Sequence, residues 1–248
     1  MIPKKIHYCW LSNNPLPELA QRCLASWKEK LPDYEIVLWD LNKFDINSTQ
    51  WTKESFEAKK YAFAADYIRL YALYTEGGIY LDSDVEVVKS FDKFLNCKSF
   101  IGFETSGDIE PAVIGAEPGV SWVRECLAYY KDRSFIGTEG SFDIKPLPLI
   151  VEKELKKVLN IGTIESSKFF ENSEISIYPS EYFSPKSFHT KGIDITKNTI
   201  CIHHFDGSWI ENNFLNKIKI VLHQFIIIVV GKNNHKKIVN LIRKIVIK

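Results

Sequence analysis

A helix pattern that two glycines end just before an apolar strand is the feature that most constrains the fold. Between residues 55 and 78 alanines favour a helix, and Phe63, Tyr67 and Tyr71 recur every four residues, which places them on one helical face. The two glycines stand where helices commonly end. Residues 79–88, IYLDSDVEVV, follow as a predicted buried strand with a polar end. A helix that leads directly into a buried strand is typical of α/β domains.

The start of the chain adds a strand, a helix and a second strand. Residues 4–12 predict a strand, residues 18–32 carry apolar side chains at helical spacing, and residues 34–40 are rich in β-branched and aromatic side chains. This succession indicates a right-handed parallel crossover. We therefore expect an α/β fold, in which ligands bind outside the carboxyl ends of the strands.

The pattern is weaker beyond residue 100. We expect the remaining elements to be strands at 99–105 and 111–119, helices at 120–133 and 148–160, and late strands at 175–185 and 198–209. The 248 residues suit one large domain or two small ones. We expect one domain, residues 1–213, followed by a helical appendage, residues 214–248.

Charge divides the chain into an acidic body and a basic tail. Residues 214–248 hold eight Lys or Arg and no Asp or Glu, whereas the first 213 residues hold 24 basic and 31 acidic side chains. An acidic body argues against nucleic acid as a partner. The apolar run at 220–230 is only eleven residues long, and a membrane span needs about 20. We expect the tail to lie on an anionic membrane surface, and the alternative is a helical pair packed on the body.

Cysteine usage and the N-terminus favour a cytoplasmic protein. The five cysteines are an odd number at wide spacing and include no C-x-x-C pair, as is common in reducing compartments. The first ten residues, MIPKKIHYCW, are too short and too polar for a signal peptide or an anchor. We therefore expect a cytoplasmic location, with peripheral contact at the inner face of the cell membrane.

Two aspartates, Asp82 and Asp84, end the apolar strand. Residues two apart in a strand point to the same side, so both carboxylates can converge on one ligand while Ser83 faces away. Close carboxylates raise each other's pKa unless a positive charge lies between them. A divalent cation supplies that charge, and hard oxygen ligands suit Mg²⁺ or Mn²⁺, which commonly bridge phosphates. The pair predicts a metal and a phosphorylated substrate, although solvated strand ends also carry such pairs.

Four motifs stand in order along the chain: IPKKIHYCWLS, SWKEKLPDYEIVLWD, FAADYIRLYALYTEGGIYLDSDVEVV and IHHFDGSW. Together they resemble those of the DXD-containing glycosyltransferases of family 32, which are retaining enzymes. This family includes yeast mannosyltransferases and bacterial capsular polysaccharide enzymes, and it is similar at its motifs to the large clostridial glucosylating toxins. The resemblance covers residues 1–95 and returns at 200–209. The resemblance implies a nucleotide-sugar-binding domain of A type, a Rossmann-like mixed sheet flanked by helices.

The resemblance implies roles for four residues of the central motif. Asp84 would bind the metal directly, and Asp82 would reach the donor's ribose or contact the metal through water. Asp66 would accept hydrogen bonds from sugar hydroxyls, and Arg69 would assist the sugar or the phosphates. Asp66 and Arg69 stand three apart on the predicted helix, so an intrahelical salt bridge is the alternative.

The first and last motifs add an aromatic side chain and a histidine. The resemblance implies that Trp10 stacks on the nucleobase, for which an indole offers a flat face, and the alternative is core packing. It also implies a metal ligand at His203 or His204. Adjacent residues of a strand face opposite sides, so we expect one histidine at the metal and choose His204. Contacts from Ser208 and Trp209 to the diphosphate follow from the same resemblance.

The expected activity is transfer of a hexose from a nucleotide-diphosphate sugar to a saccharide or lipid-linked saccharide, with Mn²⁺ or Mg²⁺ and with retention. A UDP-sugar is favoured, UDP-galactose is the first donor to test, and capsular or surface polysaccharide synthesis is the expected setting. The catalytic residues would be Asp82, Asp84 and Arg69. No carboxylate is marked as a covalent nucleophile, so we expect front-face attack through an oxocarbenium-like state, with the leaving phosphate as base.

Three other interpretations of the sequence compete with a transferase. A phosphatase of the haloacid-dehalogenase type also places D-x-D after an apolar strand, but near the first strand of the fold. A calcium loop needs a glycine where Val87 stands. A non-enzymatic membrane-surface scaffold would use only the basic tail. The loop carboxylates Glu104, Glu139 and Asp143 receive no role from the sequence.

Overall fold

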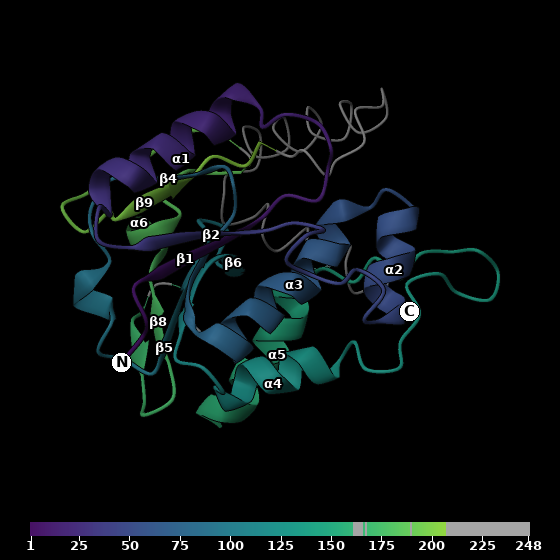
Figure 1. Ribbon diagram of the computed structural model, residues 1–248. Coiled ribbons are helices and arrows are strands. Elements are labelled where there is room, and N and C mark those ends of the chain that lie inside the picture. The colour runs from purple at the N-terminus through teal and green to yellow at the C-terminus, as the bar shows by residue number, and fades with distance from the viewer. Residues whose placement is uncertain (161–165, 167, 189, 207–248) are drawn as a thin grey trace.

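A seven-stranded mixed sheet forms the centre of the protein in the computed structural model, which describes residues 1–160, 166, 168–188 and 190–206 (Figure 1). The strands lie in the order β2 (Glu35–Trp39), β1 (Lys5–Cys9), β3 (Gly78–Leu81), β6 (Ile109–Ala116), β5 (Ser99–Phe103), β8 (Ser176–Tyr178) and β7 (Phe170–Glu171). Strand β1 is parallel to β2 and β3, whereas β6 is antiparallel to β3 and β5. The expected α/β fold with a mixed sheet is confirmed.

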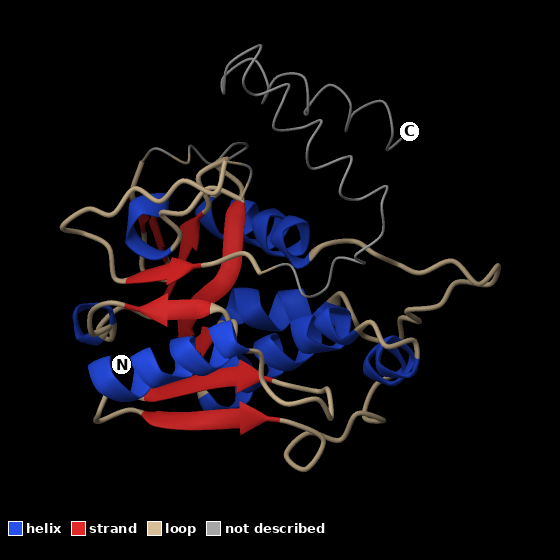
Figure 2. Ribbon diagram, turned by 90° about the horizontal axis from the view of Figure 1, so that it is seen from above, coloured by secondary structure: helices blue, strands red, loops and turns tan. Residues whose placement is uncertain are grey.

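Helices cover the sheet on both faces (Figures 1 and 2). The helices are α1 (Glu18–Lys30), α2 (Gln50–Glu57), α3 (Tyr61–Glu76), α4 (Ser121–Ala128), α5 (Leu147–Leu159), α6 (Ser180–Phe183) and the 3₁₀ turn η1 (Asp92–Phe94). One hydrophobic cluster joins α3, α4 and α5 to one face, with Leu73 and Trp122 fully buried. A second cluster joins α1, η1 and α6 to the opposite face through Trp27, Phe100 and Phe183. Each of these two faces thus has its own core.

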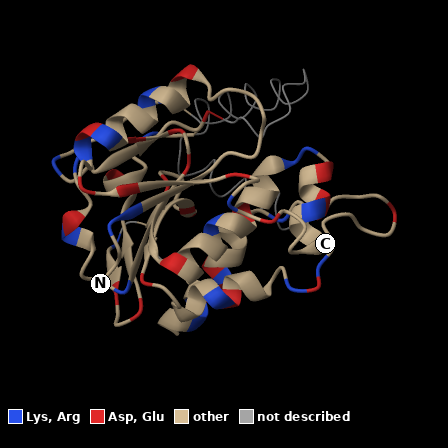
Figure 3. Cartoon of the chain, in the orientation of Figure 1, with Lys and Arg blue, Asp and Glu red and all other residues tan. Residues whose placement is uncertain are grey.

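Charged residues of both signs occur along these helices (Figure 3). Figure 3 shows both signs of charge interspersed along α1, α4 and α5. Helix α1 illustrates the pattern, because its buried residues Ala20, Cys23 and Trp27 recur at helical spacing while its five charged residues are all exposed. The amphipathic pattern of residues 18–32 therefore identifies this helix correctly.

The predicted strand at residues 79–88 is two strands, β3 and β4 (Val85–Val87). Between them the chain turns at residues 82–84, where the Val85 N–H donates to the Asp82 carbonyl at 3.0 Å. Strand β4 leaves the central sheet and pairs antiparallel with β9 (Cys201–His203) in a separate two-stranded sheet. The two aspartates thus lie in a turn, and their convergence does not come from strand alternation. This corrects the expected geometry.

Helix α1 holds β4 by contacts along its open edge. The indole Nε1–H of Trp27 donates to the Val85 carbonyl at 2.7 Å, and the Val87 N–H donates to the hydroxyl of Ser26 at 2.9 Å. Buried backbone groups at a strand edge need such partners. Side chains of the first helix therefore replace a third strand beside β4.

The predicted helix at 55–78 is interrupted. Thr49 caps the start of helix α2, where its hydroxyl accepts from the Thr52 N–H, and the chain then breaks at Lys59, which adopts φ of 59°. Helix α3 ends as expected at Gly77, whose φ is 64°. A Cβ on Gly78 would lie 2.8 Å from the Lys5 carbonyl oxygen, and φ there is 108°. The two glycines are thus required to turn α3 into β3.

Two later expectations differ from the structure in extent. The segment 175–185 forms β8 and then α6, because Pro179 ends the strand and precedes the first turn of the helix. Of the segment expected as a strand at 198–209, the structure describes residues 198–206, and in that part the strand is β9, three residues long. The strands expected at 99–105 and 111–119 correspond to β5 and β6, and the helices expected at 120–133 and 148–160 to α4 and α5.

The basic tail lies outside the residues that the structure describes. The appendage at 214–248 and the domain boundary at residue 213 therefore stay predictions. Within the described ranges, no helix combines the length and the apolar character that a membrane crossing requires. All five cysteines lie in the described part and are unpaired.

We predict that Gly78→Ala destabilises the protein more than Gly119→Ala. Gly119 also has positive φ, 76°, but nothing lies within 4 Å of its Cβ position. Alanine there should lower the free energy of unfolding only through backbone strain, by about 1 kcal/mol. Alanine at Gly78 adds the overlap with the Lys5 carbonyl, and we expect a total of about 3 kcal/mol. Urea unfolding measures both values, and equal losses would contradict the assignment of a steric role to Gly78.

Candidate active site

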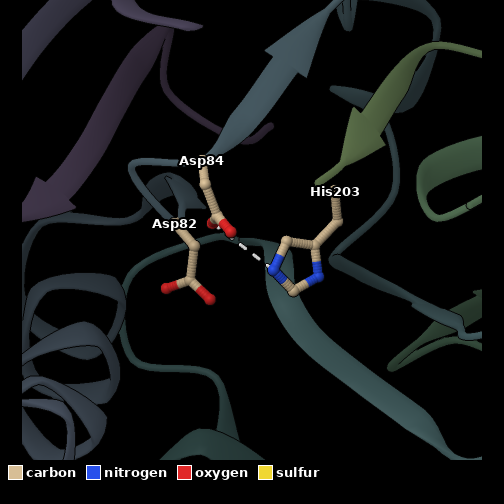
Figure 4. Close-up of side chains that lie close together, drawn as sticks. All are labelled: Asp82, Asp84 and His203. Carbon is tan, nitrogen blue, oxygen red and sulfur yellow. Dashed lines mark ion pairs between the residues drawn. The ribbon is translucent and has the colours of Figure 1, made fainter. Parts of the chain in front are cut away.

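The candidate site is built where β3 ends and β4 begins. Asp82 follows the last residue of β3, and its N–H donates to the Ala112 carbonyl of β6 at 2.9 Å. The register of the small sheet pairs Val85 with His203, which brings the end of β9 beside the turn. Figure 4 shows Asp82, Asp84 and His203 converging from these segments. The site thus lies at the carboxyl edge of the central sheet, as expected for an α/β fold.

Asp84 is fixed in this turn by groups from the far end of the described chain. Its carboxylate lies 3.4 Å from Nε2 of His203 and accepts from the Asp206 N–H at 2.8 Å. The His204 N–H donates to the backbone carbonyl of Asp84 at 3.0 Å. Burial opposes its charge, but the contacts with His203 and Asp206 prevail and hold the pKa of Asp84 at about 2. Asp84 is therefore ionised at neutral pH.

The three side chains fit a divalent cation. Asp82, Asp84 and His203 each offer one ligand atom, and these atoms all lie within 4.8 Å of one another. Two carboxylate oxygens and one imidazole nitrogen suit Mn²⁺ or Mg²⁺, which complete their shells with water or phosphate oxygens. Burial opposes the charged imidazolium, yet the carboxylates of Glu110 and Asp84 raise the pKa of His203 well above its usual value. Metal binding needs the neutral ring, so a cation must displace this proton.

His204 does not lie with the aspartates. Its Nε2 is 2.8 Å from the carboxylate of Glu86, on the other side of the strand end. The structure brings His203 beside the two aspartates, whereas the sequence analysis chose His204. The register of β4 with β9 decides between them, because Val85 pairs with His203. The metal-ligand role proposed below therefore passes to His203.

Arg69 connects the helix to the aspartate turn. Its Nη2 lies 3.1 Å from Asp66 and 3.1 Å from Asp82, and its Nη1 donates to the Pro111 carbonyl at 2.8 Å. The guanidinium carbon lies 4.6 Å from the centre of the Tyr80 ring. The salt bridge within the helix exists, but the Arg69 side chain is only 8% exposed, so it is not a weak surface pair. It joins Asp66 and Asp82 into one buried cluster.

The carboxylates of this cluster differ in acidity. Burial raises the pKa of Asp66 to about 7; Arg69 opposes the rise and Asp82 adds to it. Burial also raises the pKa of Asp82, again against the effect of Arg69. The Asp66 carboxyl is therefore partly protonated near neutral pH, whereas the Asp84 carboxyl is ionised. A carboxyl group of this kind can accept a hydrogen bond from a hydroxyl or donate one to it.

We predict that Asp66→Asn flattens the pH dependence of stability. The folded pKa of Asp66 lies above its unfolded value, so the folded state binds the extra proton, and stability is lost as pH rises from about 4 to about 7. The asparagine variant does not titrate. Urea unfolding at several pH values should show wild type losing more stability than the variant across this range. Parallel curves would contradict the raised pKa.

Trp10 lies at the same sheet edge as the aspartates. Its N–H donates to the Trp39 carbonyl at 3.1 Å and its indole Nε1–H to the Asn14 carbonyl at 2.8 Å. The ring is half-buried and helps to form a pocket outside β1 and β2. The residues lining this pocket are Trp10, Leu11, Ser12, Asn13, Leu38, Asp40, Leu41 and Asn42. A flat aromatic side chain beside polar groups is compatible with nucleobase stacking, and the ring is not packed wholly into the core.

Five further residues named from the sequence remain, two expected at the diphosphate and three loop carboxylates without an assigned role. Ser208 and Trp209 lie outside the described residues. Asp143 contacts Arg133 and the Tyr129 hydroxyl in a loop, and Glu139 is exposed. Glu104 is different, because it is half-buried near Glu110, and its pKa is raised to about 7, first by desolvation and then by the charge of Glu110.

Glu110 is a buried carboxylate that the sequence analysis missed. Its side chain is 10% exposed and lies 3.4 Å from Nδ1 of His203. A single acidic residue at the start of an apolar strand has no spacing that marks it. Only the folded hairpin of β5 and β6 brings it to the site.

Comparison with known proteins assigns the region around this site to a family. Residues 17–101 match the model of the glycosyltransferase sugar-binding region containing a DXD motif. This stretch contains Asp66, Arg69, Asp82 and Asp84. The chain thus carries the sugar-binding region of the DXD-containing glycosyltransferases.

Curated relatives cover different shares of the chain. Inositol phosphoceramide mannosyltransferase 3 of Schizosaccharomyces pombe is 32% identical over 122 residues, which is 48% of this chain and 34% of that protein. A mannosyl phosphorylinositol ceramide synthase of Saccharomyces cerevisiae is 25% identical over 214 residues, 79% of this chain and 55% of that protein. The matches therefore span about a third to about half of these relatives.

Relatives outside the yeasts and solved structures are also similar. The protein named subversion of eukaryotic traffic protein A of Legionella pneumophila is 32% identical over 111 residues, 34% of this chain and 17% of its own length. The solved structure titled PaToxG Glycosyltransferase has a TM-score of 0.49 and 18% identity, over 64% of this chain and 70% of that one.

Proposed function

We propose that this protein is a metal-dependent glycosyltransferase that moves a hexosyl group from a nucleotide-diphosphate sugar to a saccharide acceptor. The observation that carries the proposal is the convergence of Asp82, Asp84 and His203 within 4.8 Å beside the buried Arg69. The match of residues 17–101 to a sugar-binding region with a DXD motif supports it independently. The same match favours this activity over the phosphatase interpretation of the aspartate pair.

Each residue has a distinct task in this mechanism. A divalent cation held by Asp84, His203 and Asp82 offsets charge on the diphosphate when bound. Asp66 accepts hydrogen bonds from hydroxyls of the donor sugar, and Trp10 stacks on the nucleobase. Arg69 holds Asp66 and Asp82 at fixed positions and adds positive potential beside the leaving group.

The proposed chemistry retains the configuration of the anomeric carbon. The bond from that carbon to the diphosphate breaks as the acceptor oxygen attacks from the same face, through an oxocarbenium-like state. The proton of the acceptor hydroxyl passes to the leaving phosphate oxygen. No covalent intermediate with a carboxylate of this chain is needed. Ser208 and Trp209 are proposed as further hydrogen-bond donors to the diphosphate.

The donor and acceptor follow from two different arguments. The resemblance to toxins and capsule enzymes favours a UDP-sugar, with UDP-galactose as the first donor to test and a surface polysaccharide or its lipid-linked precursor as the acceptor. One yeast relative is named an inositol phosphoceramide mannosyltransferase and the other a mannosyl phosphorylinositol ceramide synthase, and these names favour a mannosyl donor and a lipid acceptor. A panel of donors separates the two possibilities.

We predict slow, metal-dependent hydrolysis of one donor. The protein is incubated with Mn²⁺ and, separately, UDP-galactose, UDP-glucose and GDP-mannose, and the free nucleotide diphosphate is measured. EDTA should stop the reaction. Asp84→Asn should lower the rate by about 100-fold or more, because a carboxylate ligand of the metal is lost. Asp33→Asn, at an exposed carboxylate paired with Lys4, should leave it unchanged. Hydrolysis of none of the donors would count against the transferase.

We further propose that the protein works at the inner face of the cell membrane, held there by residues 214–248. Eight basic and no acidic side chains in this segment favour anionic lipid. Deletion of the segment should abolish sedimentation with vesicles that contain phosphatidylserine and leave donor hydrolysis intact. Binding that persists after the deletion would refute the membrane role of the tail, including its use as a non-enzymatic anchor.

A further inference from the structure

We propose that Glu110 is a positioning residue that holds the His203 imidazole in the orientation and tautomer needed to bind a metal through Nε2. This inference rests on the proposed metal site and extends it by one residue. It gives a task to a buried carboxylate that belongs to neither the D-x-D motif nor the HHFDGSW motif.

The position of Glu110 is fixed by the central sheet. It is the second residue of β6, whose partner β3 pairs Leu81 with Val113 and ends just before Asp82. The Oε1 atom of Glu110 accepts from the Ala112 N–H at 3.1 Å, which anchors one carboxylate oxygen. The other oxygen, Oε2, is the one that faces His203.

His203 lies between two carboxylates from different elements. Its Nε2 is 3.4 Å from Asp84, and its Nδ1 is 3.4 Å from Oε2 of Glu110. Figure 4 shows that only one ring nitrogen faces the aspartates and that the other is turned away from them. The Nδ1 atom is buried and has no hydrogen-bond partner. A buried polar atom without a partner is costly, so this nitrogen is placed for a bond that the ring does not yet make.

Metal binding defines that bond. An imidazole that gives the lone pair of Nε2 to a metal carries its proton on Nδ1, and that N–H needs an acceptor. The Oε2 atom of Glu110 faces Nδ1, and an approach of about 0.5 Å gives an ordinary hydrogen bond. The Nδ1–H then donates to Glu110, and the proton stays on the ring. The Nε2 lone pair is directed at the space shared with Asp82 and Asp84.

Glu104 and Phe205 also lie near the imidazole of His203, but neither accepts the hydrogen bond from its Nδ1–H. The nearby carboxylate of Glu104 accepts a hydrogen bond from the Ser106 hydroxyl on the same hairpin. The ring of Phe205 packs against the imidazole, with 4.0 Å between the ring centres. Phe205 thus limits the tilt of the ring, and Glu110 determines which nitrogen carries the proton.

The test is a titration of the purified protein with Mn²⁺ alone, followed by electron paramagnetic resonance of the free ion. Loss of a carboxylate that orients a metal-bound histidine weakens metal binding by about 10-fold to 100-fold. We expect a loss of this size for Glu110→Ala and a smaller one for Glu110→Gln, whose amide oxygen still accepts from Nδ1–H. Glu154→Gln is the matched control, because Glu154 is equally buried but pairs with Lys157 on α5.

A second measurement separates positioning from folding. In Mg²⁺-loaded, ¹⁵N-labelled protein, nuclear magnetic resonance should show His203 protonated at Nδ1 in wild type. The isosteric Glu110→Gln variant should keep this tautomer with a weaker hydrogen bond, and Glu110→Ala should lose the preference. Thermal unfolding of each variant shows whether it folds. If Glu110→Ala does not fold, the tautomer and hydrogen bond of His203 in Glu110→Gln test the role of Glu110.

The outcomes distinguish this inference from the function on which it rests. Mn²⁺ binding that is lost in Asp84→Asn but unchanged in Glu110→Ala would overturn the role of Glu110 and leave the metal site standing. A His203 protonated at Nε2 in the loaded protein would overturn the role of Glu110 and would also remove His203 from the metal ligands, leaving Asp82 and Asp84. Wild-type protein that binds no Mn²⁺ would overturn both proposals together.

Discussion

The buried guanidinium of Arg69 is the interaction on which the site depends. It bridges Asp66 on α3 and Asp82 at the end of β3, and it also donates to the Pro111 carbonyl on β6. Three elements of the fold are thus joined through one charged group. Removing one partner of such a cluster leaves an uncompensated buried charge, which costs about 3–5 kcal/mol. The same contacts that keep the core stable therefore also set the position of the aspartate turn.

A second constraint is the departure of the chain from the central sheet after Leu81. A continuous strand would have paired residues 85–87 within the large sheet, and β9 could not then pair with them. Instead β4 is held by Trp27 and Ser26 on one side and by β9 on the other. The change of sheet opens a turn in which both aspartates face inward. It also admits a histidine about 120 residues further along the chain.

Local patterns predict much of this arrangement and fail where long-range register decides. The spacing of Asp66 and Arg69 on a helix, the two glycines and the D-x-D pair each follow from residues close in sequence, and the structure brings these groups together. The choice between His203 and His204 depends on how β9 pairs with β4, which no local pattern specifies. Glu110 was missed for the same reason, because a hairpin places it there.

The pairing of β4 with β9 has a consequence for the order in which the protein is made. Until residue 203 has left the ribosome, β4 has one edge without a partner and the aspartates lack their histidine. Contacts of such high sequence separation form late in folding. A truncated or half-synthesised chain therefore holds the sugar-binding motif without a complete cation site. If the proposed function holds, such a chain would not act on a nucleotide-sugar before the domain is whole.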